Sequence, residues 1–269
     1  MTSQYFGTFV AGAFLCAGVL GIAACSSDSD PSNTGGTGGS AGAAGGAGTG
    51  GSAGSAGFAI LDPTQEHYGK TYGAWSGAWW KWIYELPGPD FPVVDTTGAH
   101  CALGQSGDVF FLAGTTSSET VTRTCTIPAG KALFFPLANL AGDNGGVPQA
   151  EWSTDQELKD WVTETLTTVT ELSVEIDGEA VGTTVADFAA YKTGPDQFSY
   201  TVPDTADNYY RKLWETDFSG LVDPSFAGGY HLMLAPLSAG SHVIHLHTKI
   251  MVDPQSPFEF DVTYNLTVQ

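Results

Sequence analysis

The segment from Phe258 to Val268 alternates apolar and polar side chains without a break, and every even-numbered position is apolar. Successive side chains of a β-strand point to opposite faces, so a period of two places one face in a core and the other in solvent. A helix would spread the same apolar side chains around its circumference. The C-terminus therefore predicts a half-buried strand of an antiparallel sheet.

Two segments upstream, 230–234 and 241–250, share this alternation and are separated by a turn near Gly240. We expect them to pair with the C-terminal strand as a three-stranded antiparallel meander. Further short apolar runs bounded by turn residues predict strands at 108–114, 120–127, 132–137, 173–177 and 198–202. So many short strands with only two helices predict a mainly-β fold, an antiparallel β-sandwich with two packed helices.

The first predicted helix runs from Tyr72 to Glu85. Trp75, Trp79 and Trp82 recur in it at helical spacing, which indicates a face packed against the sheets. Trp80 lies off that stripe, and we expect it to be exposed. An exposed indole could stack on a sugar ring, so Trp80 is a candidate carbohydrate-binding residue.

The second predicted helix begins with a capping box, formed either by Thr154 with Glu157 or by Ser153 with Gln156. Apolar side chains continue from there at helical spacing as far as Leu172. Residues 203–229 carry no clear periodicity and are expected to be irregular.

The predicted meander also carries the most specific candidate site. Pairing apolar with apolar positions gathers His231, His245, His247 and Asp261 on the polar face. Cross-strand neighbours lie about 5 Å apart, so three imidazoles and a carboxylate could share one divalent metal ion. The alternative is a solvated face on which these side chains pair with one another.

No other cofactor is predicted, because phosphate loops, dinucleotide fingerprints and calcium loops are absent from the sequence. The segment 104–107 (GQSG) lacks the glycine spacing of a nucleophile elbow, and its serine is interpreted as a turn residue. Without a complete catalytic set, the sequence favours a non-enzymatic protein over a metal-dependent enzyme built on the histidines.

The N-terminus indicates export. An uncharged apolar stretch from Phe6 to Ala24 precedes Cys25, and the four residues 22–25 (IAAC) resemble the lipobox of bacterial lipoprotein signal peptides. The resemblance implies a signal peptide at 1–24 and an acylated Cys25 that anchors the protein in a membrane of the cell envelope. Ser26, where an aspartate would favour retention, favours the outer membrane or the cell surface over the inner membrane.

Residues 25–57 are dominated by glycine, alanine, serine and threonine and are interpreted as a tether, followed by one folded domain at 58–269. Export implies an oxidising compartment, so the remaining pair Cys101 and Cys125 predicts a disulfide. The alternative, a metal-binding or catalytic thiol, lacks a C-x-x-C spacing.

The charge balance limits the partners. The chain has 29 acidic and 9 basic side chains, and such a surface repels nucleic acids. The tryptophan helix and the segments 95–98 (DTTG), 101–107 (CALGQSG), 109–114 (VFFLAG) and 125–136 (CTIPAGKALFFP) resemble exported bacterial proteins of uncharacterised function. That resemblance implies no activity. The sequence therefore predicts a lipid-anchored binding or surface-structural module with a protein or glycan partner.

Overall fold

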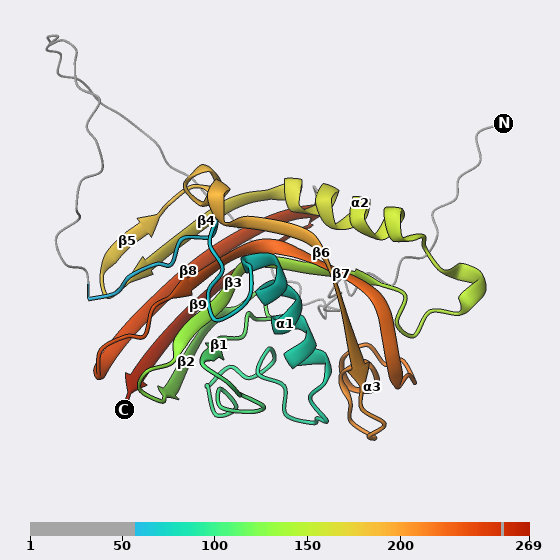
Figure 1. The fold of residues 1–269 in the computed structure, drawn as a ribbon, viewed down its shortest axis with the longest axis horizontal. Helices are drawn as coiled ribbons and strands as arrows, with labels where there is room; N and C mark the ends of the chain where they lie inside the picture. The colour runs from blue at the N-terminus through green and yellow to red at the C-terminus, as the bar shows by residue number, and fades with distance from the viewer. Residues whose placement is uncertain (1–56, 254–255) are drawn as a thin grey trace, which may run out of the picture. The chain divides into compact units, whose positions relative to one another are not determined.

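The computed structural model describes residues 57–253 and 256–269, which form two curved β-sheets and several helices (Figure 1). One sheet has four strands in the order β1-β3-β7-β6, and the other has five in the order β2-β9-β8-β4-β5. The predicted mainly-β architecture is confirmed. The predicted signal peptide, Cys25 and nearly all of the tether lie outside the described residues.

Most neighbouring strands run antiparallel, as predicted. The exceptions are β1 with β3 and β2 with β9, which pair in parallel. The four-stranded sheet consists of β1 (Val109–Phe111), β3 (Ala132–Asp143), β7 (Gly220–Leu234) and β6 (Lys192–Val202). The five-stranded sheet consists of β2 (Thr120–Ile127), β9 (Ser256–Val268), β8 (Gly240–Asp253), β4 (Val169–Ile176) and β5 (Glu179–Gly182).

The main core lies between the two sheets. The even-numbered side chains Phe260, Val262, Tyr264 and Leu266 of β9 are buried there, as the alternation predicts. Each large apolar side chain that leaves water in this way stabilises the fold by roughly 1.5–3 kcal/mol. The odd-numbered side chains of β9 point to the other face of its sheet, away from this core.

Helix α1 (Tyr72–Tyr84) covers the outer face of the four-stranded sheet and contacts β3, β6 and β7. It begins at Thr71, whose side chain accepts a hydrogen bond from the Ala74 amide and so satisfies one free donor of the first turn. Trp75, Trp79 and Trp82 are buried, which confirms the predicted face. A second, largely aromatic core therefore lies beneath α1.

Helix α2 (Asp155–Thr165) has the predicted capping box between Thr154 and Glu157 but ends earlier than predicted. A short 3-10 helix, η2 (Leu166–Thr168), follows it, and Leu172 belongs to β4. The segment expected to be irregular, 203–229, holds the five-residue helix α3 (Tyr209–Leu213) and β7 as far as Gly229. The two other 3-10 helices are η1 (Gln149–Glu151) and η3 (Val185–Tyr191).

The predicted three-stranded meander is wrong in one strand. β8 and β9 pair as expected, but β7 pairs with β3 and β6 in the opposite sheet. Residues 225–234 of β7 are all buried, because the main core covers one face of this central strand and α1 covers the other. A strand with apolar side chains on both faces is stable only where both faces of its sheet are covered. In the predicted meander, one face of β7 would have been exposed to water.

Of the helices in the described part of the chain, none is long and apolar enough to cross a membrane.

Candidate functional site

The outer face of the five-stranded sheet carries a group of charged side chains that we call the ionic cluster. Its members come from the three neighbouring strands β4, β8 and β9, and they are Glu171, His245, His247, Lys249, Glu259 and Asp261. The register places His247 opposite Asp261, and Lys249 between Glu171 and Glu259. These residues occupy the outward positions of strands whose other side chains fill the main core, so alternation alone brings them to one face.

The members of the cluster are linked by a chain of short contacts. Nε2 of His245 lies 3.0 Å from both carboxylate oxygens of Asp261, and Nδ1 of His247 lies 3.8 Å from the same carboxylate. The other ring nitrogen of His247 lies 3.5 Å from Glu171 and 3.7 Å from Glu259. Nζ of Lys249 lies 3.3 Å from each of these two glutamates.

The electrostatics of the cluster follow from these contacts. Hydrogen bonds from Lys249 and the positive charge of its ammonium lower the pKa of Glu171, and the bonds to Glu171 and Glu259 raise the pKa of Lys249. Solvent-exposed pairs of this kind contribute little to stability, about 0–1 kcal/mol each. The arrangement instead holds several charged groups in order on one face of the sheet.

The predicted metal site does not form. His245, His247 and Asp261 lie together, but His231 is in β7 of the other sheet and points to the side of α1. Its ring stacks on Phe134 at a centroid distance of 5.1 Å, and burial lowers the pKa of His231 to about 3. Within residues 57–253 and 256–269, no group of three or more histidine, cysteine, aspartate or glutamate side chains is arranged to hold a metal ion.

Trp80 is not the exposed aromatic residue that was predicted. Its ring is half-buried, stacked on Tyr84 at 5.2 Å and set edge-on to Trp79 at 5.0 Å. The prediction is wrong because the loop segments and α3 add a second layer of aromatic side chains around α1. The well exposed tryptophan is Trp152, which is 54% exposed.

The predicted disulfide between Cys101 and Cys125 is present, with the two Cα atoms 5.8 Å apart. It joins the loop after α1 to an inward position of β2. Neither thiol is free, so the alternative of a catalytic or metal-binding cysteine is excluded for this pair. The bond closes a loop of 24 residues and stabilises the fold by about 3–4 kcal/mol in the chain-entropy model.

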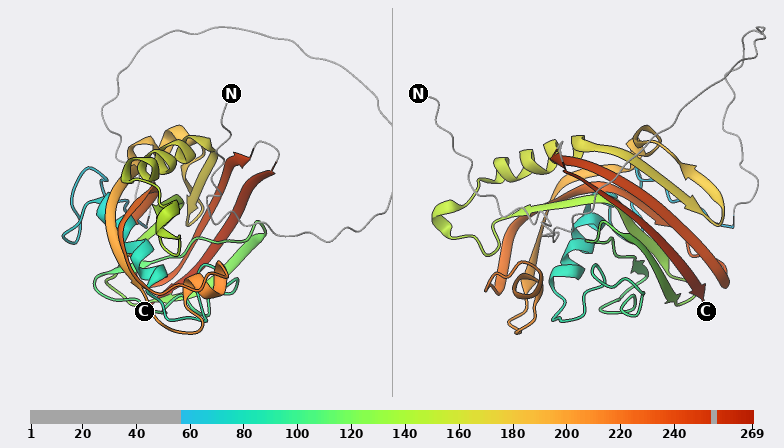
Figure 2. Two further views of the ribbon diagram at one scale, coloured as in Figure 1. Left: turned by 90° about the vertical axis from the view of Figure 1, so that its right-hand side faces the viewer. Right: turned by 180° about the vertical axis from the view of Figure 1, so that it is seen from behind.

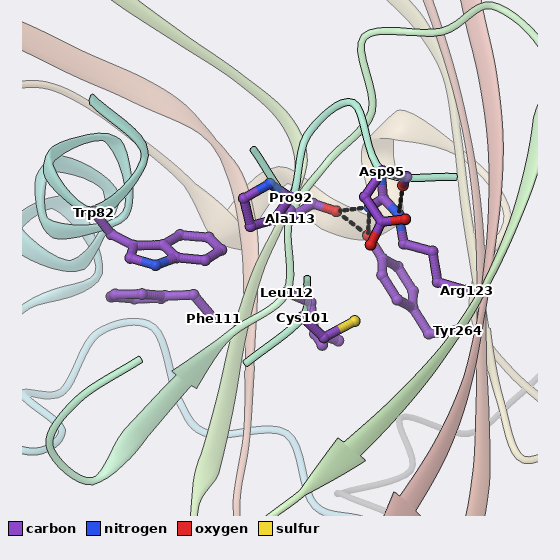
Figure 3. Close-up of a pocket in the computed structure, with 9 residues that line it drawn as sticks. All are labelled: Trp82, Pro92, Asp95, Cys101, Phe111, Leu112, Ala113, Arg123 and Tyr264. Atoms are coloured by element: carbon purple, nitrogen blue, oxygen red, sulfur yellow. Dashed lines mark hydrogen bonds between the residues drawn. The ribbon is translucent and has the colours of Figure 1, made fainter. Parts of the chain in front are cut away.

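Arg123 is a buried cation that sequence reasoning missed. Only 1% of it is exposed, and it donates hydrogen bonds to the carbonyls of Asp95 (2.6 Å), Ala113 (2.5 Å) and Gly114 (2.9 Å) (Figure 3). A cavity of about 10 Å³ beside it has room for about one water molecule. Arg123 therefore pins loop segments onto β2 rather than serving a substrate site. Its inward position in an alternating strand was the signal that could have revealed it.

A second missed group resembles a catalytic triad. Asp177, His242 and Ser238 form a chain in which His242 Nδ1 lies 2.7 Å from the carboxylate and Nε2 lies 3.4 Å from the serine hydroxyl. Nε2 also donates to the Ser238 carbonyl at 3.0 Å. Burial opposes the charged form of His242, but the hydrogen bonds to the Asp177 carboxylate and the Ser238 carbonyl raise its pKa overall. The group links the turn after β4, which carries Asp177, to the turn between β7 and β8, which carries Ser238.

A third missed group surrounds Asp143 at the end of β3. Burial raises the pKa of Asp143, although its carboxylate accepts hydrogen bonds from Tyr200 (2.9 Å), Tyr210 (3.3 Å), Ser225 (3.2 Å) and the Gly145 amide (2.9 Å). The partners come from β6, α3, β7 and the loop after β3. A carboxylate with this many hydrogen bonds links separate segments of the chain. Both of its oxygens already accept hydrogen bonds from within the protein.

No protein-family model matches this chain, and no curated protein sequence matches it. Among solved structures, the chain is similar to PbICP-C in its complex with falcipain-2, at 14% identity over 61% of this chain and 100% of that chain, with a TM-score of 0.24. It is also similar to the solution structure of amebosin, at 11% identity over 56% of this chain and 96% of that chain, with a TM-score of 0.19.

A further similar structure is that of the cysteine protease inhibitor EhICP2 from Entamoeba histolytica. It is 11% identical over 56% of this chain and 95% of that chain, with a TM-score of 0.19. At TM-scores this low, the likenesses carry no inference about the fold, the partner or the activity of this chain.

Proposed function

We propose that this chain is a bacterial envelope lipoprotein whose folded domain binds a protein partner through the ionic cluster. The anchor is supported by the sequence at residues 22–25 (IAAC), which follows an uncharged apolar stretch. Acylation of Cys25 would hold the protein at the outer membrane or the cell surface, with the glycine-rich segment as a tether.

The proposed binding face is supported by one observation. Helix α1 covers the outer face of the four-stranded sheet, on the far side of the main core from β8 and β9 (Figure 2). The ionic cluster lies on the outer face of the sheet that contains β8 and β9. A row of part-exposed charged side chains spans three neighbouring strands there. Ordered polar groups of this kind favour recognition over stability.

The charge of the face favours a basic partner. Three carboxylates in the cluster outnumber its single ammonium group, and the whole chain has a formal net charge of −20. Complementary charge accelerates encounter and fixes the register of a complex. A protein surface rich in lysine and arginine is therefore the partner that this face fits.

The anchor is tested by replacing Cys25 with serine in cells that express the chain. Wild type is expected to incorporate labelled palmitate and to partition into the detergent phase of Triton X-114, because acyl chains dominate its partitioning. The Cys25→Ser variant is expected to lose both properties. Equal labelling of the two proteins would refute the anchor and leave the binding face untouched.

The binding face is tested by placing a photo-crosslinking amino acid at Ser173 or Thr263, two outward positions beside the cluster. We expect a discrete crosslinked partner in intact cells. Replacing Glu171 and Glu259 with glutamine is expected to reduce the crosslink strongly, because it removes the two carboxylates that flank Lys249.

The matched control replaces Glu66 and Glu164 with glutamine, two exposed carboxylates outside the cluster that change the net charge equally. This control is expected to retain the crosslink. A crosslink that survives the loss of Glu171 and Glu259, or one that both double variants weaken equally, would show that the cluster does not select the partner.

A further inference from the structure

Trp152 differs from the other tryptophans in its exposure. It is 54% exposed, whereas Trp75, Trp79 and Trp82 are at most 9% exposed and the remaining three are half-buried. It lies in the loop between β3 and α2, which projects beyond the two sheets (Figure 1). In the part of the chain that the structure describes, no aromatic ring or cation stacks on its indole. About half of this side chain is therefore accessible to a ligand.

The orientation of this ring is fixed by the loop. Its Nε1 donates a hydrogen bond of 2.8 Å to the Val147 carbonyl. The side chain of Asn144 bonds both the amide and the carbonyl of Ser153, each at 2.9 Å, and the capping box of α2 begins at Thr154. A ring ordered before binding loses little conformational entropy when a ligand stacks on it.

The loop that carries the ring also carries polar side chains. Gln149 and Glu151 on this loop and Asp155 at the start of α2 are exposed, and their amide and carboxylate oxygens can accept hydrogen bonds from hydroxyl groups. Polarised C–H groups on one face of a sugar ring are attracted by the negative face of an indole. An aromatic platform on a loop with several exposed polar side chains is thus suited to a carbohydrate.

We propose that Trp152 is the stacking platform of a subsite for neutral pyranose oligosaccharides, separate from the ionic cluster and independent of the protein partner proposed there. Glu151, the residue before Trp152, and the formal net charge of −20 disfavour acidic glycans and anionic lipid headgroups.

The subsite is tested with the full chain purified in detergent and labelled with 5-fluorotryptophan. The chain has seven tryptophans, so the fluorine spectrum assigns one signal to each, and Trp152→Phe identifies that of Trp152. Cellohexaose, chitohexaose and maltohexaose are the probes. At least one is expected to shift the Trp152 signal selectively, and Trp152→Ala is expected to weaken its binding at least about tenfold.

Trp152→Phe keeps a ring and is expected to retain most of the affinity, while Leu221→Ala removes another exposed apolar side chain and is expected to change nothing. Circular dichroism verifies that each variant is folded. The proposal is overturned if none of the three sugars binds, or if Trp152→Ala binds them as wild type does. After reconstitution without detergent into vesicles of brominated phosphatidylcholine and phosphatidylglycerol, quenching of tryptophan fluorescence that Trp152→Phe removes, without sugar binding, would overturn it in favour of a membrane contact.

Discussion

The outer faces of the two sheets carry the same residue type in opposite settings. His231 on the four-stranded sheet lies under α1, stacked on Phe134, and burial lowers its pKa to about 3. His245 and His247 on the five-stranded sheet lie in the ionic cluster, beside carboxylates and solvent. The covering layer, rather than the strand, decides whether an outward histidine becomes part of a core or part of a surface.

The two outer faces therefore differ in what they contribute to the domain. The covered face stabilises the fold through apolar burial, which is proportional to the area removed from water. The open face contributes little stability and keeps charged groups available. Substitutions on the two faces should therefore differ in size, and the following predictions test that difference.

The largest effect is expected from Trp79→Ala. Trp79 is 2% exposed, and its Nε1 donates a 3.0 Å hydrogen bond to the Leu112 carbonyl. Removing it leaves a cavity beneath α1 and an unpaired carbonyl, which costs about 3–5 kcal/mol. Urea unfolding followed by circular dichroism measures the loss. A loss below about 1 kcal/mol would mean that α1 does not cover a packed core.

The next effect is a pH dependence that belongs to the covered face. Because His231 has a pKa of about 3 in the folded protein and about 6.5 when unfolded, acid protonates the unfolded state first. Stability is thus fully present above pH 6.5 and falls as the pH drops below it, by about 2 kcal/mol between pH 7 and pH 5. Urea unfolding at both pH values should show this fall in wild type and a much smaller one in His231→Phe.

His242 should show the opposite sign, at the end of the open sheet. Burial alone would lower its pKa, but hydrogen bonds to the Asp177 carboxylate and the Ser238 carbonyl raise it overall. Its contribution is present below the unfolded pKa and is lost as the pH rises through the folded pKa. We expect His242→Gln to cost about 1–2 kcal/mol at pH 6 and less at pH 9. An equal cost at the two pH values would contradict a raised pKa of His242 in the folded protein.

The smallest effect is expected on the open face itself. Replacing Glu171 and Glu259 with glutamine breaks the pairs with Lys249, yet such exposed pairs contribute little, so we expect a change of less than about 1 kcal/mol. Thermal unfolding at low and high salt measures it. A loss as large as that of Trp79→Ala would show that the ionic cluster holds the fold together.

The sequence predicted the local features well where one period or one cap decides them. The alternation of β9, the tryptophan face of α1 and the capping box at Thr154 are all confirmed. The disulfide was predicted from the expected compartment and is present. The first three depend on residues close in the sequence, and the disulfide joins the only two cysteines that follow Cys25 in the sequence.

The candidate site was predicted only in part. His245, His247 and Asp261 share a face because β8 and β9, which follow each other closely in the sequence, pair in one antiparallel register. His231 was misplaced, since β7 joins the other sheet, and Trp80 was misplaced, since distant segments cover it. Arg123 and Asp143 were missed because their partners come from segments far apart in the sequence.

The sequence by itself determined which side chains of each strand face opposite ways, because backbone geometry imposes a period of two on any strand. Only the tertiary structure decided which neighbour each strand pairs with and which sheet face is covered. Alternation distinguishes the two faces of β7 and β8, but it does not predict which helix or sheet covers each face. Those facts depend on how α1 and the two sheets pack together, and they place one histidine in a core and two in the ionic cluster.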